Sequence, residues 1–158
     1  FLRNYRICRS ALLRKKYGIF LDSDLQHAPE EIAIFIEKQL KTNSNIVLGK
    51  RDLTHTMPVH RMLSNILTSF LISLRTGVRI HDSQCGFRLL NLENINPNNY
   101  NYDGFQFESE FLLRKLNKNA KVREVNISTI YNGHGSNMEH IKDTLRFIKM
   151  YFASYFWK

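Results

Sequence analysis

Two aspartates one residue apart follow a short apolar run near the start of the chain. The run, residues 19–21, comes after Gly18 and suits a buried strand. Asp22 and Asp24 then follow at the carboxyl end of that strand. Strands of open α/β sheets present ligand-binding groups at that end, so we expect these two carboxylates to serve a binding site.

A divalent cation would resolve the repulsion between these two carboxylates. Two ionised carboxylates held close together cost free energy unless a counter-charge is present. Asp22 and Asp24 with the amide oxygen of Gln26 form an all-oxygen ligand set, which suits Mg²⁺ or Mn²⁺ better than zinc. Such an ion keeps open positions for phosphate oxygens. The spacing therefore predicts a metal site that takes a phosphorylated substrate.

Three other interpretations use the same residues. A phosphatase of the haloacid dehalogenase type also places Asp-x-Asp after an apolar strand, but it needs Thr or Val where this chain has Gln26. A calcium-binding loop needs a third oxygen ligand and then Gly, and here His27 follows Gln26. In the third interpretation the aspartates only end the strand, and Asp24 or His27 precedes a helix that begins near Pro29.

The charge of the chain points to an anionic partner. The 158 residues fit one domain, and the formal net charge is +9. That balance suits a phosphorylated substrate, an acidic membrane surface or nucleic acid. The sequence has no readable nucleic-acid motif, so we expect no nucleic-acid partner. Cys8 and Cys85 are too few and too far apart for a disulfide framework or a zinc site, which indicates a reducing, cytosolic setting.

Alternating helices and strands position the candidate residues. Proline, glycine and the apolar spacing predict a helix from Pro29 to residues 42–45, a strand at 45–51, helices at 60–76 and 105–116, a strand carrying Arg88, a strand at 122–131 and a helix within 137–158. The apolar residues at helical spacing in the first two helices are expected to pack inward. In the 60–76 helix, one face could contact lipid instead. The two sets are Ile32, Phe35, Ile36 and Leu40, and Met62, Ile66, Phe70 and Leu74.

Further polar groups adjoin these elements. Lys50 and Arg51 end a strand and could grip a pyrophosphate, or they could be two solvated charges. Asp82 and Arg88 lie on either side of Gly86, an arrangement that would orient a sugar phosphate or form a structural ion pair. Two glutamates near the start of the 105–116 helix are explained by the helix dipole, although one could face the site; they are Glu108 and Glu110.

The C-terminal helix is basic on one side and aromatic at its end. Its apolar stripe comprises Ile141, Leu145, Ile148, Phe152 and Phe156, with Lys142, Arg146 and Lys149 beside it. This pattern is typical of a helix that lies in a membrane interface. A terminal helix packed on its own domain is the alternative.

Taken in order, these segments resemble the catalytic half of family-2 glycosyltransferases of the GT-A fold, particularly the dolichol-phosphate mannosyltransferases and their bacterial polyprenyl-phosphate relatives. The resemblance rests on residues 20–26, 29–30, 49–51, 82–88 and 107–131. It implies an α/β fold, a partial GT-A (Rossmann-like) mixed sheet flanked by helices and followed by an amphipathic helix. Residues 1–137 would form the C-terminal part of the GT-A domain, and residues 138–158 the helix at the membrane interface.

The resemblance also implies an activity. The chain would be a metal-dependent, inverting enzyme on the cytosolic face of a membrane, moving a sugar from a nucleotide-diphosphate sugar to a polyprenyl phosphate. It assigns the Mg²⁺ or Mn²⁺ to Asp22, Asp24 and Gln26, catalysis to Asp82 and Arg88, and substrate binding to Lys50, Arg51, Gln84 and Ser136. Asp82 would act as a base for a hydroxyl acceptor and as a positioning group for a phosphate acceptor.

The position at which the sequence begins suggests an alternative to the enzyme hypothesis. Family members begin with a βαβ unit that holds the nucleotide base and ribose, and this sequence starts after it, at Phe1. We therefore keep a second hypothesis, in which the chain is a non-catalytic fragment or a basic module that binds anionic membranes or nucleic acid. Binding that ignores metal and nucleotide sugar but weakens steeply with salt would favour it.

Overall fold

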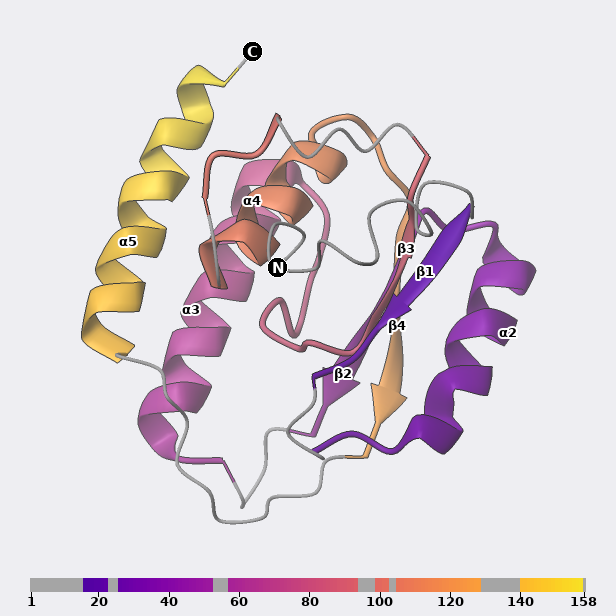
Figure 1. Ribbon diagram of the computed structural model, residues 1–158. Helices are drawn as coiled ribbons and strands as arrows, with labels where there is room; N and C mark the ends of the chain where they lie inside the picture. Colours follow the sequence, from indigo (N-terminus) through magenta and orange to yellow (C-terminus); the bar gives the residue numbers. More distant parts are fainter. Residues whose placement is uncertain are drawn as a thin grey trace.

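The computed structural model describes residues 16–22, 26–52, 57–93, 99–102, 105–128 and 140–157. Within these residues, four strands form one mixed sheet, and helices cover both of its faces (Figure 1). The predicted α/β class, with a mixed sheet flanked by helices, is confirmed. Asp24 and Ser136 lie outside the described residues.

The sheet brings the ends of its strands to one edge. Its order is β1-β3-β2-β4, with β1 Tyr17–Phe20, β2 Ile46–Arg51, β3 Arg88–Asn91 and β4 Val122–Ile127. β3 is antiparallel to both β1 and β2, whereas β2 and β4 are parallel. The carboxyl ends of β1, β2 and β4 therefore meet the amino end of β3. The polar segments singled out in the sequence adjoin these ends.

β1 is less buried than its apolar run suggests. Its four residues are all half-buried, and Leu21 beyond it is 36% exposed. The reason is its position, because β1 is an outer strand among the described residues, hydrogen-bonded there only to β3.

Three helices cover one face of the sheet. They are α3 Val59–Thr76, α4 Phe105–Leu116 and α5 His140–Ala153, which is followed by the short η3 Ser154–Phe156. α5 packs on α3 and α4 and is the outermost of the three (Figure 1). The core beneath them includes the fully buried Leu112, Leu113 and Met150.

α2 covers the other face, in a different orientation from the one expected. The short η1 Pro29–Glu31 leads into α2 Ile32–Thr42, as predicted. Phe35 is buried and stacks on Phe87 with ring centroids 4.2 Å apart. Ile36 and Leu40, however, are exposed, and Gln39 is buried in their place. The line Phe35–Gln39 contacts the sheet, and residues one position further lie about 100° around the helix.

The burial pattern of α3 is the reverse of the sequence prediction. Its buried residues are Asn65, Thr68, Ser69 and Ile72, of which three are polar. The polar side chains are inside because they bind the segment 82–84: Asn65 donates to Asp82, Ser69 bonds to Ser83, and Gln84 donates to Thr68.

The apolar side of α3 consequently faces outward, and α5 and η3 also carry exposed apolar residues. The exposed set comprises Val59, Leu63, Ile66, Leu67, Phe70 and Leu74, then Leu145, Phe152, Tyr155 and Phe156. The prediction that the α3 stripe packs inward was therefore wrong. None of the helices in the described part of the chain is long and apolar enough to span a membrane.

Candidate active site

Asp22 is held against Gly86 at the edge where β1 ends. Phe20 pairs with Arg88 in the antiparallel register, and the same register continued by two residues places Asp22 opposite Gly86. A Cβ atom on residue 86 would lie only 2.0 Å from Oδ2 of Asp22 and 2.5 Å from Oδ1. The absence of a side chain at Gly86 thus creates the space that the Asp22 carboxylate occupies. Gln26, the other described residue of the predicted metal set, is half-buried.

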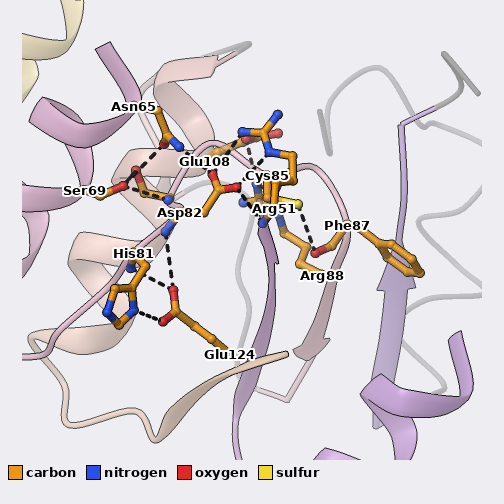
Figure 2. Close-up of polar contacts among 11 residues, drawn as sticks. Arg51, Asn65, Ser69, His81, Asp82, Cys85, Phe87, Arg88, Glu108 and Glu124 are labelled. Atoms are coloured by element: carbon orange, nitrogen blue, oxygen red, sulfur yellow. Dashed lines mark hydrogen bonds and ion pairs between the residues drawn. The ribbon is translucent and has the colours of Figure 1, made fainter. Parts of the chain in front are cut away.

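A second carboxylate and a buried arginine lie near Asp22. Arg88 is 3% exposed and donates from its Nη2 to Glu108 Oε2 at 2.8 Å, as well as to the Cys85 carbonyl (Figure 2). Burial raises the pKa of Glu108 above its ordinary value, the positive charge of Arg88 opposes that shift, and the carboxylate of Asp22 adds to it. The buried Nε of Arg88 has no hydrogen-bond partner among the described residues.

These groups fit a cation together with an anionic ligand. Two carboxylates that lie close together repel each other, and a divalent ion between them removes that repulsion. A buried guanidinium donor without a partner is suited to a phosphate oxygen. Among the described residues there is no cluster of three or more metal-binding side chains. The remaining predicted ligand, Asp24, lies outside that part of the chain.

Arg51 and Asp82 pair with each other rather than facing Asp22. The guanidinium of Arg51 makes two bonds to the Asp82 carboxylate, at 2.7 Å from Nε and 2.9 Å from Nη2 (Figure 2). Asn65 donates to the same carboxylate at 2.9 Å. Asp82 and Arg51 are 1% and 8% exposed. The geometry is that of a buried structural pair. The sequence offered such a pair for Asp82 and Arg88, but Asp82 binds Arg51, and Arg88 binds Glu108 instead.

The remaining predicted residues are divided between two places. Gln84 donates to Thr68 and lines a small cavity to which Glu108 also contributes. Lys50 lines a separate cleft against α3, together with Arg79 and His81. Glu108 thus links Asp22 and Arg88 to the cavity lined by Gln84, whereas Lys50 lies in a different cleft.

Comparison with known sequences identifies the family. The sequence model described as glycosyl transferase family 2 matches residues 8–96, more than half of the chain. The chain belongs to glycosyltransferase family 2. It is 31% identical over 151 residues to uncharacterized protein MJ0544 of Methanocaldococcus jannaschii, covering 87% of this chain and 65% of that protein.

Two further proteins are similar to the chain, one in sequence and one in fold. The UDP-N-acetylglucosamine–dolichyl-phosphate N-acetylglucosaminyltransferase of Methanococcus voltae is 29% identical over 120 residues, covering 72% of this chain and 48% of that enzyme. The crystal structure of glucosyl-3-phosphoglycerate synthase from Mycobacterium tuberculosis has a similar fold, with a TM-score of 0.63 at 15% identity over 91% of this chain and 52% of that one. The chain thus spans about half to two-thirds of the length of these proteins.

Glu108 is a residue of this site that the sequence named only as one of two glutamates, either of which could face it. Its position in the first turn of α4 gave it a sufficient explanation in the helix dipole. Glu110, in the second turn of α4, is fully buried and accepts bonds from the backbone N–H groups of Asn101 and Tyr102. The sequence did contain a signal for this difference. Two residues that are two positions apart on a helix point to different sides, so the helix dipole could not explain Glu108 and Glu110 in the same way.

Proposed function

We propose that this chain carries the metal- and diphosphate-binding part of a glycosyltransferase that moves a sugar from a nucleotide-diphosphate sugar to a polyprenyl phosphate. The observation that carries the proposal is the Asp22 carboxylate held against Gly86, close enough to Glu108 to raise its pKa. Arg88 offsets the charge of Glu108, and a divalent cation beside Asp22 would offset the rest of the repulsion between the two carboxylates. The family membership makes a nucleotide sugar the natural ligand of that cation.

Mg²⁺ or Mn²⁺ would be held by Asp22 with Asp24 and Gln26. When bound, the ion supplies positive charge that stabilises the departing diphosphate. The protein's contribution is to hold Asp22 in place, which it does through the space at Gly86. Arg88 adds a second positive charge, fixed in orientation by Glu108 and the Cys85 carbonyl, and its Nε can donate to a phosphate oxygen.

The acceptor decides whether a base is required. A polyprenyl phosphate is already anionic near neutral pH, so it attacks the sugar without losing a proton. For a hydroxyl acceptor, Glu108 is the better-placed proton acceptor, because its pKa is raised and it is close to Asp22. Asp82 is committed to Arg51 and Asn65, so we assign it the positioning role, in which it holds the segment 82–84 against α3.

Two similar proteins support the choice of ligands. The relative from Methanococcus voltae is named for transfer from UDP-N-acetylglucosamine to dolichyl phosphate. The structural neighbour from Mycobacterium tuberculosis is a complex with Mn²⁺, UDP and glucosyl-3-phosphoglycerate. We take from these a uridine nucleotide, Mn²⁺ and a polyprenyl phosphate as the first compounds to test.

We further propose that the outward apolar face of α3 and α5 lies on the cytosolic surface of a membrane containing anionic lipid. α3 and α5 pack against each other, both carry exposed apolar side chains, and Lys142, Arg146 and Lys149 are exposed on α5. Apolar side chains with cations beside them suit the boundary between acyl chains and anionic headgroups. A polyprenyl phosphate would be reached from that surface.

Calorimetric titration with nucleotide tests the donor site. We expect UDP or GDP to bind the 158-residue chain in the presence of Mn²⁺, and the heat of binding to disappear without the ion. Asp22→Asn should abolish the metal-dependent part. Glu93→Gln is the matched control, because it removes one exposed carboxylate near the other end of β3. Binding that is indifferent to Mn²⁺ or to Asp22→Asn would contradict the proposal.

Vesicle co-sedimentation tests the membrane surface. Vesicles containing phosphatidylserine should retain the chain better than vesicles of phosphatidylcholine alone. Replacing Leu63 and Leu74 by Gln should lower retention, because these side chains are 58% and 64% exposed on α3. Leu40→Gln changes a leucine on α2 that is even more exposed, at 73%, but lies across the sheet, and it should leave retention unchanged. Equal losses from both faces would refute the assignment.

A further inference from the structure

A cleft of about 730 Å³ lies between α3 and the carboxyl ends of β2 and β4. It is separate from the site at Asp22, which follows β1. In the order β1-β3-β2-β4, the two strands that border the cleft are two and three strand spacings from β1, about 10 Å for β2 and about 14 Å for β4. The volume is within the range of small-ligand sites. Neither the family assignment nor the proposed donor site uses this cleft.

A histidine in the cleft is held by a carboxylate. Glu124 on β4 accepts a hydrogen bond from the backbone N–H of His81 at 2.8 Å and pairs with Nδ1 of the same residue (Figure 2). A carboxylate only accepts, so Nδ1 carries the hydrogen and the ring is fixed with Nε2 on its other side. The His81 side chain is 39% exposed, whereas Glu124 is 14% exposed. This is the arrangement by which proteins orient an imidazole toward a ligand.

Cations line the same cleft. Lys50 from the end of β2 and Arg79 from the segment after α3 join His81, and Asp52 is the carboxylate among the lining residues. Arg51 also lines the cleft, but its charge is matched by Asp82. The charges that are not paired in this way therefore favour an anion, in agreement with the net charge of +9.

We propose that this cleft binds a phosphate group through His81, Lys50 and Arg79. When the His81 ring is protonated, its Nε2 donates to a phosphate oxygen. When the ring is neutral, Nε2 accepts a hydrogen bond from a protonated phosphate oxygen. Lys50 and Arg79 supply charge-assisted bonds. The opposite wall is apolar, with Ile66 and Phe70 of α3, which are 48% and 60% exposed. That wall would accommodate the hydrocarbon of a lipid phosphate, although a phosphate-bearing solute offers the same headgroup chemistry.

Titration with two phosphate sources tests the proposal. Inorganic phosphate and the short-chain lipid dihexanoyl phosphatidic acid are added to the chain, with dihexanoyl phosphatidylcholine as the lipid without a free phosphate. We expect saturable changes in the NMR signals of the His81 ring with at least one phosphate source and none with the choline lipid. Saturation by inorganic phosphate assigns the cleft to a solute, and saturation only by phosphatidic acid assigns it to a lipid. No saturable change with either source overturns the proposal.

Variants then locate the interaction. Arg79→Met and His81→Gln change exposed side chains, so the fold should be retained, and each should weaken the calorimetric affinity about tenfold. His60→Gln, an exposed histidine at the start of α3, is the matched control. Asp22→Asn should leave this binding intact, which separates it from the donor site. Unchanged affinity in both Arg79→Met and His81→Gln overturns the proposal.

Discussion

Gly86→Ala should disable the donor site while leaving the fold intact. The new Cβ would lie 2.0 Å from Oδ2 of Asp22, and ordinary contact begins at 3.4 Å, so that oxygen must move by about 1.4 Å. Asp22 is exposed, so its side chain can rotate away. Alanine also restricts the unfolded chain, and we therefore expect the free energy of unfolding to change by no more than about 1 kcal/mol.

The functional cost should be much larger than the structural one. Displacing a metal-binding carboxylate, or the groups that orient it, typically weakens metal affinity about 10- to 100-fold. Calorimetry of UDP with Mn²⁺ should show a loss of that size in Gly86→Ala, and urea denaturation should show a nearly unchanged midpoint. In an Asp22→Ala background, Gly86→Ala should have no further effect on UDP affinity, because the atom it displaces is gone.

A second glycine provides the control. Gly77 ends α3 with φ of +69°, and no atom lies within 4 Å of a Cβ built there. Gly77→Ala should therefore lower stability by about 1 kcal/mol through backbone strain and leave UDP affinity unchanged. Wild-type affinity in a folded Gly86→Ala chain, or an additional loss in the Asp22→Ala background, would refute the account of how Asp22 is held.

Three further predictions concern buried groups. Arg51→Met should lower the free energy of unfolding by about 3–5 kcal/mol in urea denaturation, because it leaves the Asp82 carboxylate buried without its partner; a loss below about 1 kcal/mol would mean that the pair is not buried. Because the pKa of Glu108 is raised, the folded state binds that proton more tightly than the unfolded state, so in metal-free buffer stability should fall as the pH rises from 4.5 through the raised pKa. Glu108→Gln should flatten this decline, and an unchanged slope would contradict it. Burial raises the pKa of the Cys85 thiol to about 12, so alkylation of Cys85 should be slow until urea unfolds the chain. Mass spectrometry of the peptide that contains Cys85 measures this rate, and rapid labelling of the folded chain would count against its burial.

Local patterns in the sequence were sufficient for the order of the elements. Helical spacing of apolar residues located α2, α3 and α4 to within a few residues, and Pro29 marked the start of η1 before α2. The strand before Asp22 and the strand carrying Arg88 were also confirmed. These are short-range signals, set by residues that are neighbours in the chain.

The orientation of α3 could not be obtained in the same way. An apolar stripe shows that a helix has two different faces, but the stripe does not say which face is inside. Here Asn65 and Ser69 are inside because Asp82 and Ser83 need hydrogen-bond partners, and those residues are more than a dozen positions away. The pairing of Arg51 with Asp82 across 31 positions is of the same kind.

The position of Mn²⁺ on the chain tests the central claim most directly. Bound Mn²⁺ broadens the NMR signals of nearby nuclei, so a titration with trace Mn²⁺ in the presence of UDP maps the metal. We predict selective broadening at Gly86 and Glu108, little effect at Asn119 beyond the far end of α4, and loss of the effect in Asp22→Asn. Broadening centred elsewhere, or unchanged in Asp22→Asn, would contradict the assignment of Asp22 to a metal-dependent donor site.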